Sequence, residues 1–204
     1  MFFSFDGIDG TGKSTQVARF VPWLKEQGHA VVECRDPGGT ALGERVREIL
    51  LHRQEIEMGG VAEMLLYMAA RAQLVEEVIR PALGRGETVV CDRFLLANVA
   101  YQGYGGGLGA KVVRDVGEIA VGSEMPVCVF LLDMPADAAA RRMNRSLDRL
   151  ESRGLVFLKR VRQGYLEEAA RNDHIHVIDA DQEVEGVWRD IERVASELLH
   201  RRHV

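Results

Sequence analysis

The sequence has few of the residues that mark a secreted, membrane-embedded or disordered chain. Among its 204 residues only 3 are cysteine, 5 are proline and 6% are aromatic. No apolar run approaches the ~18 residues of a membrane span. The N-terminal MFFSF is too short and uncharged for a signal peptide. We therefore expect a cytoplasmic protein without a membrane partner, folded as one domain over residues 1–204.

The cysteines are too few and too scattered for a disulfide framework. Cys34, Cys91 and Cys128 lie singly within or at the end of apolar, strand-like runs, and none belongs to a CxxC pair. We interpret them as reduced core residues.

Basic side chains are also fewer than acidic ones: 26 basic and 31 acidic side chains give a formal charge of −5. The whole chain is therefore not expected to bind nucleic acid. Residues 141–162 are the exception, with eight basic and two acidic side chains. Such a run is either a solvated helix face with i,i+4 ion pairs or a functional segment.

Short apolar runs alternate with longer segments of helical periodicity. This alternation predicts an α/β fold, a parallel sheet with helices on both faces. The expected strands are 2–5, 31–34, 88–91, 127–132 and 176–178. The expected helices are 13–27, 41–52, 61–83, 110–121, 135–143, 155–170 and 184–201. The glycine-rich segment 103–109 (GYGGGLG) is expected to be a flexible loop.

The stretch GIDGTGKST, residues 7–15, fits the P-loop pattern G-x4-G-K-S. It follows the first expected strand and begins the first expected helix, which is the context that the motif requires. In a P-loop the backbone N–H groups and the helix N-terminus surround phosphate, while Lys13 and Ser14 would contact the phosphates and Mg²⁺. We therefore expect ATP binding by Gly7, Ile8, Asp9, Gly10, Thr11, Gly12, Lys13, Ser14 and Thr15.

Two classes of P-loop protein fit poorly. A switch GTPase needs an NKxD motif to read guanine, and no asparagine here precedes lysine. A motor or helicase normally has more chain than one 204-residue domain. A small P-loop kinase remains, and it needs an acceptor pocket and a mobile source of positive charge.

Three other stretches place polar residues near expected strand ends, where open α/β sheets bind ligands. They are RDPGGT after the second strand, Asp92 and Arg93 after the third, and Tyr67 with Arg71 on the helix 61–83. Each also has a structural interpretation: a turn with a helix cap, a structural ion pair, and a surface cation–π pair, respectively.

Taken together, the chain resembles the bacterial thymidylate kinase family. The matching stretches are GIDGTGKST, RDPGGT, LLYMAARAQLVEEVIRPAL, DRFLLANVAYQG, SLDRLE, YLEEAA and HVIDA. The resemblance implies a three-layer P-loop kinase fold with a five-stranded parallel sheet and an arginine-rich lid at about 142–154. It implies transfer of the γ-phosphoryl group of ATP to dTMP with Mg²⁺, usually in a homodimer, in dTTP synthesis.

The same resemblance assigns roles to individual residues. Asp9 would contact the acceptor sugar, Arg93 its phosphate, Tyr67 and Arg71 its base, and Tyr101 would crowd the sugar 2′ position. The full dTMP set is Asp9, Asp36, Pro37, Tyr67, Arg71, Arg93, Asn98, Tyr101 and Gln102. The catalytic set is Lys13, Asp9, Arg93, Arg145 and Arg149.

Family members supply a mobile arginine from the P-loop or from the lid. Here the P-loop position is Thr11, so the resemblance assigns that role to Arg145 and Arg149, with Arg142 on ATP. Ser14 and Asp92 are the metal candidates, although the sequence leaves open whether Asp9, Asp92 or Asp133 lies nearest Mg²⁺.

Three residues depart from the usual family pattern. Phe94 replaces a more common Tyr or His, Ala97 replaces Ser, and Asp36 replaces Glu. Phe94 and Ala97 motivate an alternative, a nucleoside or nucleoside-monophosphate kinase with another base preference. A further alternative, from a different class, is a non-catalytic nucleotide-binding or nucleic-acid-associated P-loop protein.

Overall fold

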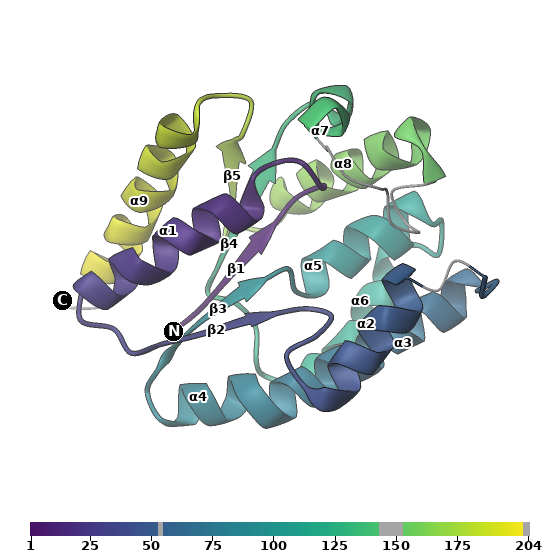
Figure 1. Cartoon of the computed structure of the whole chain (residues 1–204), viewed down its shortest axis with the longest axis horizontal. Coiled ribbons are helices and arrows are strands. Elements are labelled where there is room, and N and C mark those ends of the chain that lie inside the picture. Colours follow the sequence, from purple (N-terminus) through teal and green to yellow (C-terminus); the bar gives the residue numbers. More distant parts are fainter. Residues whose placement is uncertain (53–54, 143–152, 202–204) are drawn as a thin grey trace.

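The computed structural model describes residues 1–52, 55–142 and 153–201 (Figure 1). Most of the expected lid, including Arg145 and Arg149, lies outside these residues. No helix in the described ranges is long and apolar enough to cross a membrane.

The core of the fold is a five-stranded parallel sheet in the order β2-β3-β1-β4-β5. Its strands are β1 (Phe2–Asp6), β2 (Val31–Arg35), β3 (Thr88–Asp92), β4 (Cys128–Asp133) and β5 (Ile175–Asp179). Both the predicted fold class and the five expected strands are confirmed. Each strand extends at least one residue beyond the predicted C-terminal boundary and ends on a charged side chain.

Alternate residues of the central strand pack into two different apolar clusters. Phe3 and Phe5 belong to a cluster with Phe20 of α1, whereas Phe2 joins a second cluster with Leu74 and Ile79. Helices therefore cover both faces of the sheet, as expected for parallel strands. In Figure 1, α1 and α9 lie side by side, and the two helices are in contact.

The helices follow the predicted periodicity at most positions. They are α1 (Lys13–Glu26), α2 (Ala41–His52), α3 (Gly60–Leu74), α4 (Arg80–Gly84), α5 (Leu95–Asn98), α6 (Ala110–Val121), α7 (Ala136–Arg142), α8 (Leu155–Ala169) and α9 (Val184–Arg201), with π-helical segments η1 (Val75–Ile79) and η2 (Val99–Gly105). The single helix expected over 61–83 is thus interrupted by η1. Pro81, near the start of α4, has no N–H for an α-helical hydrogen bond, and the widened turn lies directly before α4.

The prediction of a loop over 103–109 is wrong for its first part, because η2 continues through Gly105. Close packing explains the glycine: a Cβ on Gly105 would lie 2.6 Å from Val161 and 2.8 Å from Phe157, both on α8. Likewise, a Cβ on Gly164 of α8 would lie 2.5 Å from the Tyr104 ring. Here glycine allows two helices to approach each other, a role that composition alone did not distinguish from a loop.

The cysteines are confirmed as free and buried.

Candidate active site

The five strands end at one edge of the sheet, and each contributes a charged residue there. These residues are Asp6, Arg35, Asp92, Asp133 and Asp179. Because parallel strands share their direction, the loops that follow β1, β2 and β3 meet at this edge. This edge of the sheet carries the P-loop, the RDPGGT stretch after β2, and Asp92 with Arg93 at the end of β3.

The P-loop has the geometry required to surround phosphate. Gly12 precedes α1 with φ 89° and no side-chain cap, so the first N–H groups of the helix remain available to an anion. Gly7 has φ 136°, and a Cβ there would lie 2.4 Å from the Leu132 carbonyl oxygen. Lys13 Nζ donates to the Gly7 and Ile8 carbonyls at 3.1 and 2.9 Å, which fixes the lysine over the loop.

A cavity of about 500 Å³ lies over this loop. Its lining combines the P-loop with charged side chains of both signs from α2 and from the ends of β2 and β3: Asp9, Gly10, Gly12, Lys13, Ser14, Thr15, Arg35, Asp36, Arg47, Asp92 and Arg93. Burial, and then Arg93, lower the pKa of Lys13, while the neighbouring carboxylates Asp9 and Asp92 raise it. A bound polyphosphate would supply further negative charge beside Lys13, Arg35, Arg47 and Arg93.

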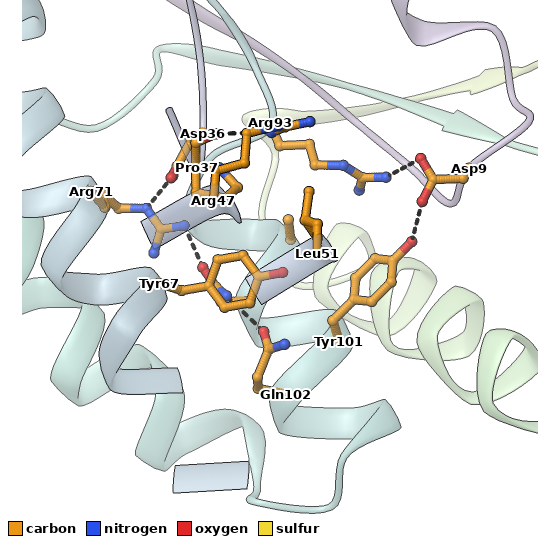
Figure 2. Close-up of a pocket in the computed structure, with 12 residues that line it drawn as sticks. Asp9, Asp36, Pro37, Arg47, Leu51, Tyr67, Arg71, Arg93, Tyr101 and Gln102 are labelled. Atoms are coloured by element: carbon orange, nitrogen blue, oxygen red, sulfur yellow. Dashed lines mark hydrogen bonds and ion pairs between the residues drawn. The ribbon is translucent and has the colours of Figure 1, made fainter. Parts of the chain in front are cut away.

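A second pocket, of about 120 Å³, opens beside the first (Figure 2). It is lined by Asp9, Asp36, Pro37, Arg47, Leu51, Tyr67, Arg71, Arg93, Ala97, Asn98, Tyr101 and Gln102. Asp9, Asp36, Arg47 and Arg93 line both cavities. The site therefore provides a phosphate cavity and a mixed apolar and polar pocket that meet at charged residues.

The deep wall of this second pocket is a row of buried polar side chains. Arg71 Nε donates to Asp36 Oδ2 at 2.6 Å, and Arg71 Nη2 donates to Asn98 Oδ1 (Figure 2). Asn98 Nδ2 in turn donates to Gln102 Oε1 at 2.6 Å. Burial raises the pKa of Asp36, and Arg71 partly offsets this effect. Tyr67 and Arg71 are thus both buried, and the interpretation of a surface cation–π pair is wrong.

Phe94, one of the three departures, lies behind this wall. Its ring packs edge-on against the Phe2 ring, with the two centroids 4.9 Å apart. The Arg71 guanidinium carbon lies 5.4 Å from the Phe94 ring centroid. The Phe94 carbonyl accepts from Arg71 Nη2 at 3.3 Å. Phe94 therefore supports Arg71 and is not among the lining residues, whereas Ala97 is.

Arg93 lies between the two cavities. Among the described residues it is the one non-glycine residue with positive φ, at 67°, a conformation that usually costs free energy. Its Nη2 donates to Asp9 Oδ1 at 2.7 Å and its Nη1 to the Gly7 carbonyl at 2.8 Å. The ion pair is thus with Asp9 and not with the adjacent Asp92. Tyr101 lies nearby, with its hydroxyl 3.4 Å from Asp9 Oδ2.

The carboxylates differ in their availability to a metal ion. Asp9 is paired with Arg93, and Asp133 with Arg162. Asp92 Oδ1 is buried and has no hydrogen-bond partner within the described part of the chain. Asp92 and Ser14 line the same cavity, and hard oxygen ligands of this kind suit Mg²⁺. The residues present therefore fit a magnesium ion held beside phosphate.

The sequence prediction did not include two other charged residues. Arg47 of α2 lines both cavities and donates to the Pro37 carbonyl at 2.8 Å. Glu63 of α3 is fully buried beside Gln102. Neither belongs to a short motif, so only the packing of α2 and α3 identifies them. Arg142, predicted to bind ATP, donates to the Ala180 carbonyl at 3.0 Å.

The RDPGGT stretch serves two purposes. Thr40 Oγ1 accepts from the Gly43 N–H at 2.9 Å, so the stretch does cap α2. Its Asp36 and Pro37 also line the second pocket.

A P-loop at the sheet edge, joined to a pocket with a buried arginine and two amides, defines a P-loop kinase with a small-molecule acceptor. Comparison with known proteins narrows this class. The family model "Thymidylate kinase" matches residues 5–191, and the chain belongs to this family.

Individual relatives match along nearly their whole length. A thymidylate kinase of Kosmotoga olearia is 48% identical over 202 residues, covering 98% of this chain and 95% of that protein. One of Fervidobacterium nodosum is 44% identical and is covered completely. The crystal structure of thymidylate kinase from Ehrlichia chaffeensis superposes with a TM-score of 0.78 at 31% identity, covering 96% of this chain and 98% of that one.

Proposed function

We propose that this chain is a thymidylate kinase: it transfers the γ-phosphoryl group of ATP to dTMP, giving dTDP and ADP, in dTTP synthesis. The family membership supports this activity. The observation that carries the proposal is that the phosphate cavity and the acceptor pocket share Asp9, Asp36, Arg47 and Arg93. A nucleotide in each would bring donor and acceptor phosphates together at those residues.

In this mechanism the P-loop binds the donor. The N–H groups at the start of α1 and the Lys13 ammonium contact the β- and γ-phosphates and stabilise their negative charge. Lys13 is 6% exposed and paired with Asp9 at 3.6 Å. It is therefore held in position before ATP arrives, which lowers the cost of orienting it in the transition state.

The acceptor is oriented from both ends. Arg93 and Arg47 bind its phosphate. Tyr67 stacks on the base, and Arg71 and Asn98 form hydrogen bonds with the edge of the base. The acceptor phosphate has a second pKa of about 6 and is mostly a dianion at neutral pH. No general base is required, so catalysis rests on alignment and charge stabilisation.

Magnesium and the lid complete the charge balance in this proposal. Mg²⁺, held by Ser14 and Asp92, would neutralise charge on the donor phosphates. Arg145 and Arg149 would supply positive charge over the transferred group. We also propose a cytoplasmic homodimer. Its dimeric state is supported by exposed apolar side chains on two helices in mutual contact, Leu65 of α3 with Val112 and Ile119 of α6.

The test is a phosphotransfer assay with Mg-ATP over dTMP, dUMP, dCMP, dGMP, AMP and thymidine, with products separated by anion-exchange chromatography. We expect the highest kcat/KM with dTMP. Lys13→Met is the control for contaminating kinases and should lose at least ~10²-fold in kcat. Preference for any other acceptor would defeat the proposal. Salt-sensitive DNA binding without phosphotransfer would instead favour the non-catalytic class.

A further inference from the structure

Glu63 is a buried carboxylate with no role in the mechanism above. It lies on α3 with 0% exposure, and a charge is costly to bury unless it is paired and hydrogen-bonded. Both of its oxygens are engaged: Oε1 accepts from Gln102 Nε2 at 2.8 Å, and Oε2 accepts from Arg153 Nη2. Glu63 is not among the residues that line the acceptor pocket.

Through Gln102, Glu63 is connected to the base-contacting wall of the pocket. Gln102 Oε1 accepts from Asn98 Nδ2, and Asn98 Oδ1 accepts from Arg71 Nη2. Figure 2 shows this row from Asp36 to Gln102. One continuous chain of hydrogen bonds thus connects four side chains from α3, η2 and α5: Glu63, Gln102, Asn98 and Arg71.

The chemistry at the two ends of this chain fixes its direction. A carboxylate only accepts hydrogen bonds and a guanidinium only donates them. The side-chain amides of Asn98 and Gln102 lie between Arg71 and Glu63. All hydrogen bonds of the row form in only one orientation of these amides, with each NH₂ group facing the Glu63 side. Flipping either amide would oppose two donors or two acceptors.

That orientation matters for the base. Asn98 Oδ1 accepts from Arg71 Nη2 and both residues line the pocket, so the wall has an acceptor oxygen next to a guanidinium. Thymine offers an N–H at N3 next to a carbonyl at C4, which complements this pattern. Cytosine offers an unprotonated N3 next to an amino group, which opposes it. An unmatched buried polar group is penalised more strongly than a missing apolar contact.

We propose that Glu63 is a positioning residue for acceptor recognition, holding Gln102 and, through it, Asn98 in the orientation that selects thymine over cytosine. Arg153 balances its charge from the other side, and the Arg153 guanidinium carbon lies 5.1 Å from the Phe157 ring centroid. This inference rests on the proposed function, because it concerns the same acceptor pocket.

Three variants separate acceptor positioning from general stability. Glu63→Met has a similar length but cannot accept the Gln102 hydrogen bond. Glu63→Gln combined with Arg153→Met keeps an oxygen for Gln102, and its NH₂ group then faces no donor from Arg153. Arg153→Met removes the charged partner and leaves the Glu63–Gln102 contact intact. Steady-state kinetics with dTMP, dCMP and ATP, together with Tm, are measured for each variant.

We expect Glu63→Met to raise the KM for dTMP at least ~10-fold, with kcat and the KM for ATP within about 3-fold of wild type. Its dTMP over dCMP ratio of kcat/KM should fall at least ~10-fold. The double variant Glu63→Gln/Arg153→Met and the single variant Arg153→Met should keep the KM for dTMP within about 3-fold, even if Tm falls. Should Glu63→Met fail to fold, Glu63→Ala takes its place with the same expected direction.

An unchanged KM for dTMP in Glu63→Met would overturn the proposal. So would equal effects of Glu63→Met and the double variant Glu63→Gln/Arg153→Met on the KM for dTMP, or an equal rise in the KM for ATP. Wild-type enzyme inactive on dTMP would instead defeat the proposed function, so the two failures are distinguishable.

Discussion

Arg162 binds both carboxylate oxygens of Asp133. Its Nε lies 2.7 Å from Oδ1 and its Nη2 lies 2.8 Å from Oδ2. This two-point pair ties α8 to the end of β4. It also engages one of the three carboxylates that the sequence offers for Mg²⁺, and Arg93 similarly engages Asp9.

Asp92 should consequently dominate the magnesium dependence of the reaction. We expect Asp92→Asn to raise the Mg²⁺ concentration for half-maximal activity at least ~10-fold, because a hard cation prefers a carboxylate oxygen to an amide. The measurement is a magnesium titration at saturating ATP and dTMP. Asp133→Asn removes a charge from the same sheet edge and should shift the midpoint by less than about 3-fold. A larger shift for Asp133→Asn than for Asp92→Asn would reverse the assignment.

The lid arginines should affect turnover more than acceptor affinity. Arg145→Ala or Arg149→Ala should lower kcat at least ~10²-fold with a modest change in the KM for dTMP, because the missing charge acts on the transferred phosphoryl group. Arg141→Ala is a suitable control, since Arg141 is 72% exposed and pairs only loosely with Asp137 at 3.6 Å. Wild-type turnover in both lid variants would show that positive charge comes from elsewhere.

Tyr101 should control the choice between deoxyribose and ribose. Tyr101 is 4% exposed, and the Arg93 guanidinium carbon lies 5.2 Å from its ring centroid. Tyr101→Ala opens space at the sugar, so the preference for dTMP over its ribonucleotide counterpart should fall at least ~10-fold in kcat/KM. Tyr101→Phe keeps the ring and should keep the preference within about 3-fold. Equal loss in both variants would point to the hydroxyl, not to steric exclusion.

Asp6 should make stability depend on pH. Burial raises the pKa of Asp6 from 3.8 to about 6, although Arg93 and Lys13 lower it; Asp92 also raises it, while a hydrogen bond from Ser4 lowers it. The folded state therefore favours the protonated acid. The contribution of protonated Asp6 to the free energy of unfolding is fully present below pH 3.8 and is lost as pH rises through about 6.

Asp6→Asn removes this titration. The free energy of unfolding of wild type, measured relative to Asp6→Asn, should fall by about 2–3 kcal/mol between pH 4 and pH 7. Urea unfolding in EDTA at four pH values measures it. Asp115→Asn, at a side chain that is 55% exposed, should show a difference that is nearly constant with pH. Parallel curves for wild type and Asp6→Asn would contradict the prediction.

Periodicity predicted the sheet and most helices because buried parallel strands and amphipathic helices have distinct patterns. It missed α5 and η2, since their residues are almost all buried and carry no one-sided apolar stripe. The glycines of 103–109 were interpreted from composition as a loop. Their actual role depends on how closely α8 approaches, which only the tertiary structure determines.

The candidate site could be predicted where a local motif carries the chemistry. The P-loop is such a motif, and the resemblance assigned Arg71, Asn98 and Gln102, which the structure brings together in one row. The roles proposed for Arg47 and Glu63 depend on contacts between residues that are distant in the sequence, such as Glu63 and Arg153. Similarly, no sequence pattern indicated that Asp133 would be engaged by Arg162.

The left-handed backbone of Arg93 has a consequence for how this protein can change. At φ 67° a glycine would fit without steric cost, but it would lose the ion pair with Asp9 and the hydrogen bond to the Gly7 carbonyl. The strained backbone at this position is therefore tolerated for the contacts that the Arg93 side chain makes where the two cavities meet. No single substitution there can both relieve the strain and keep those contacts, because only glycine adopts positive φ freely.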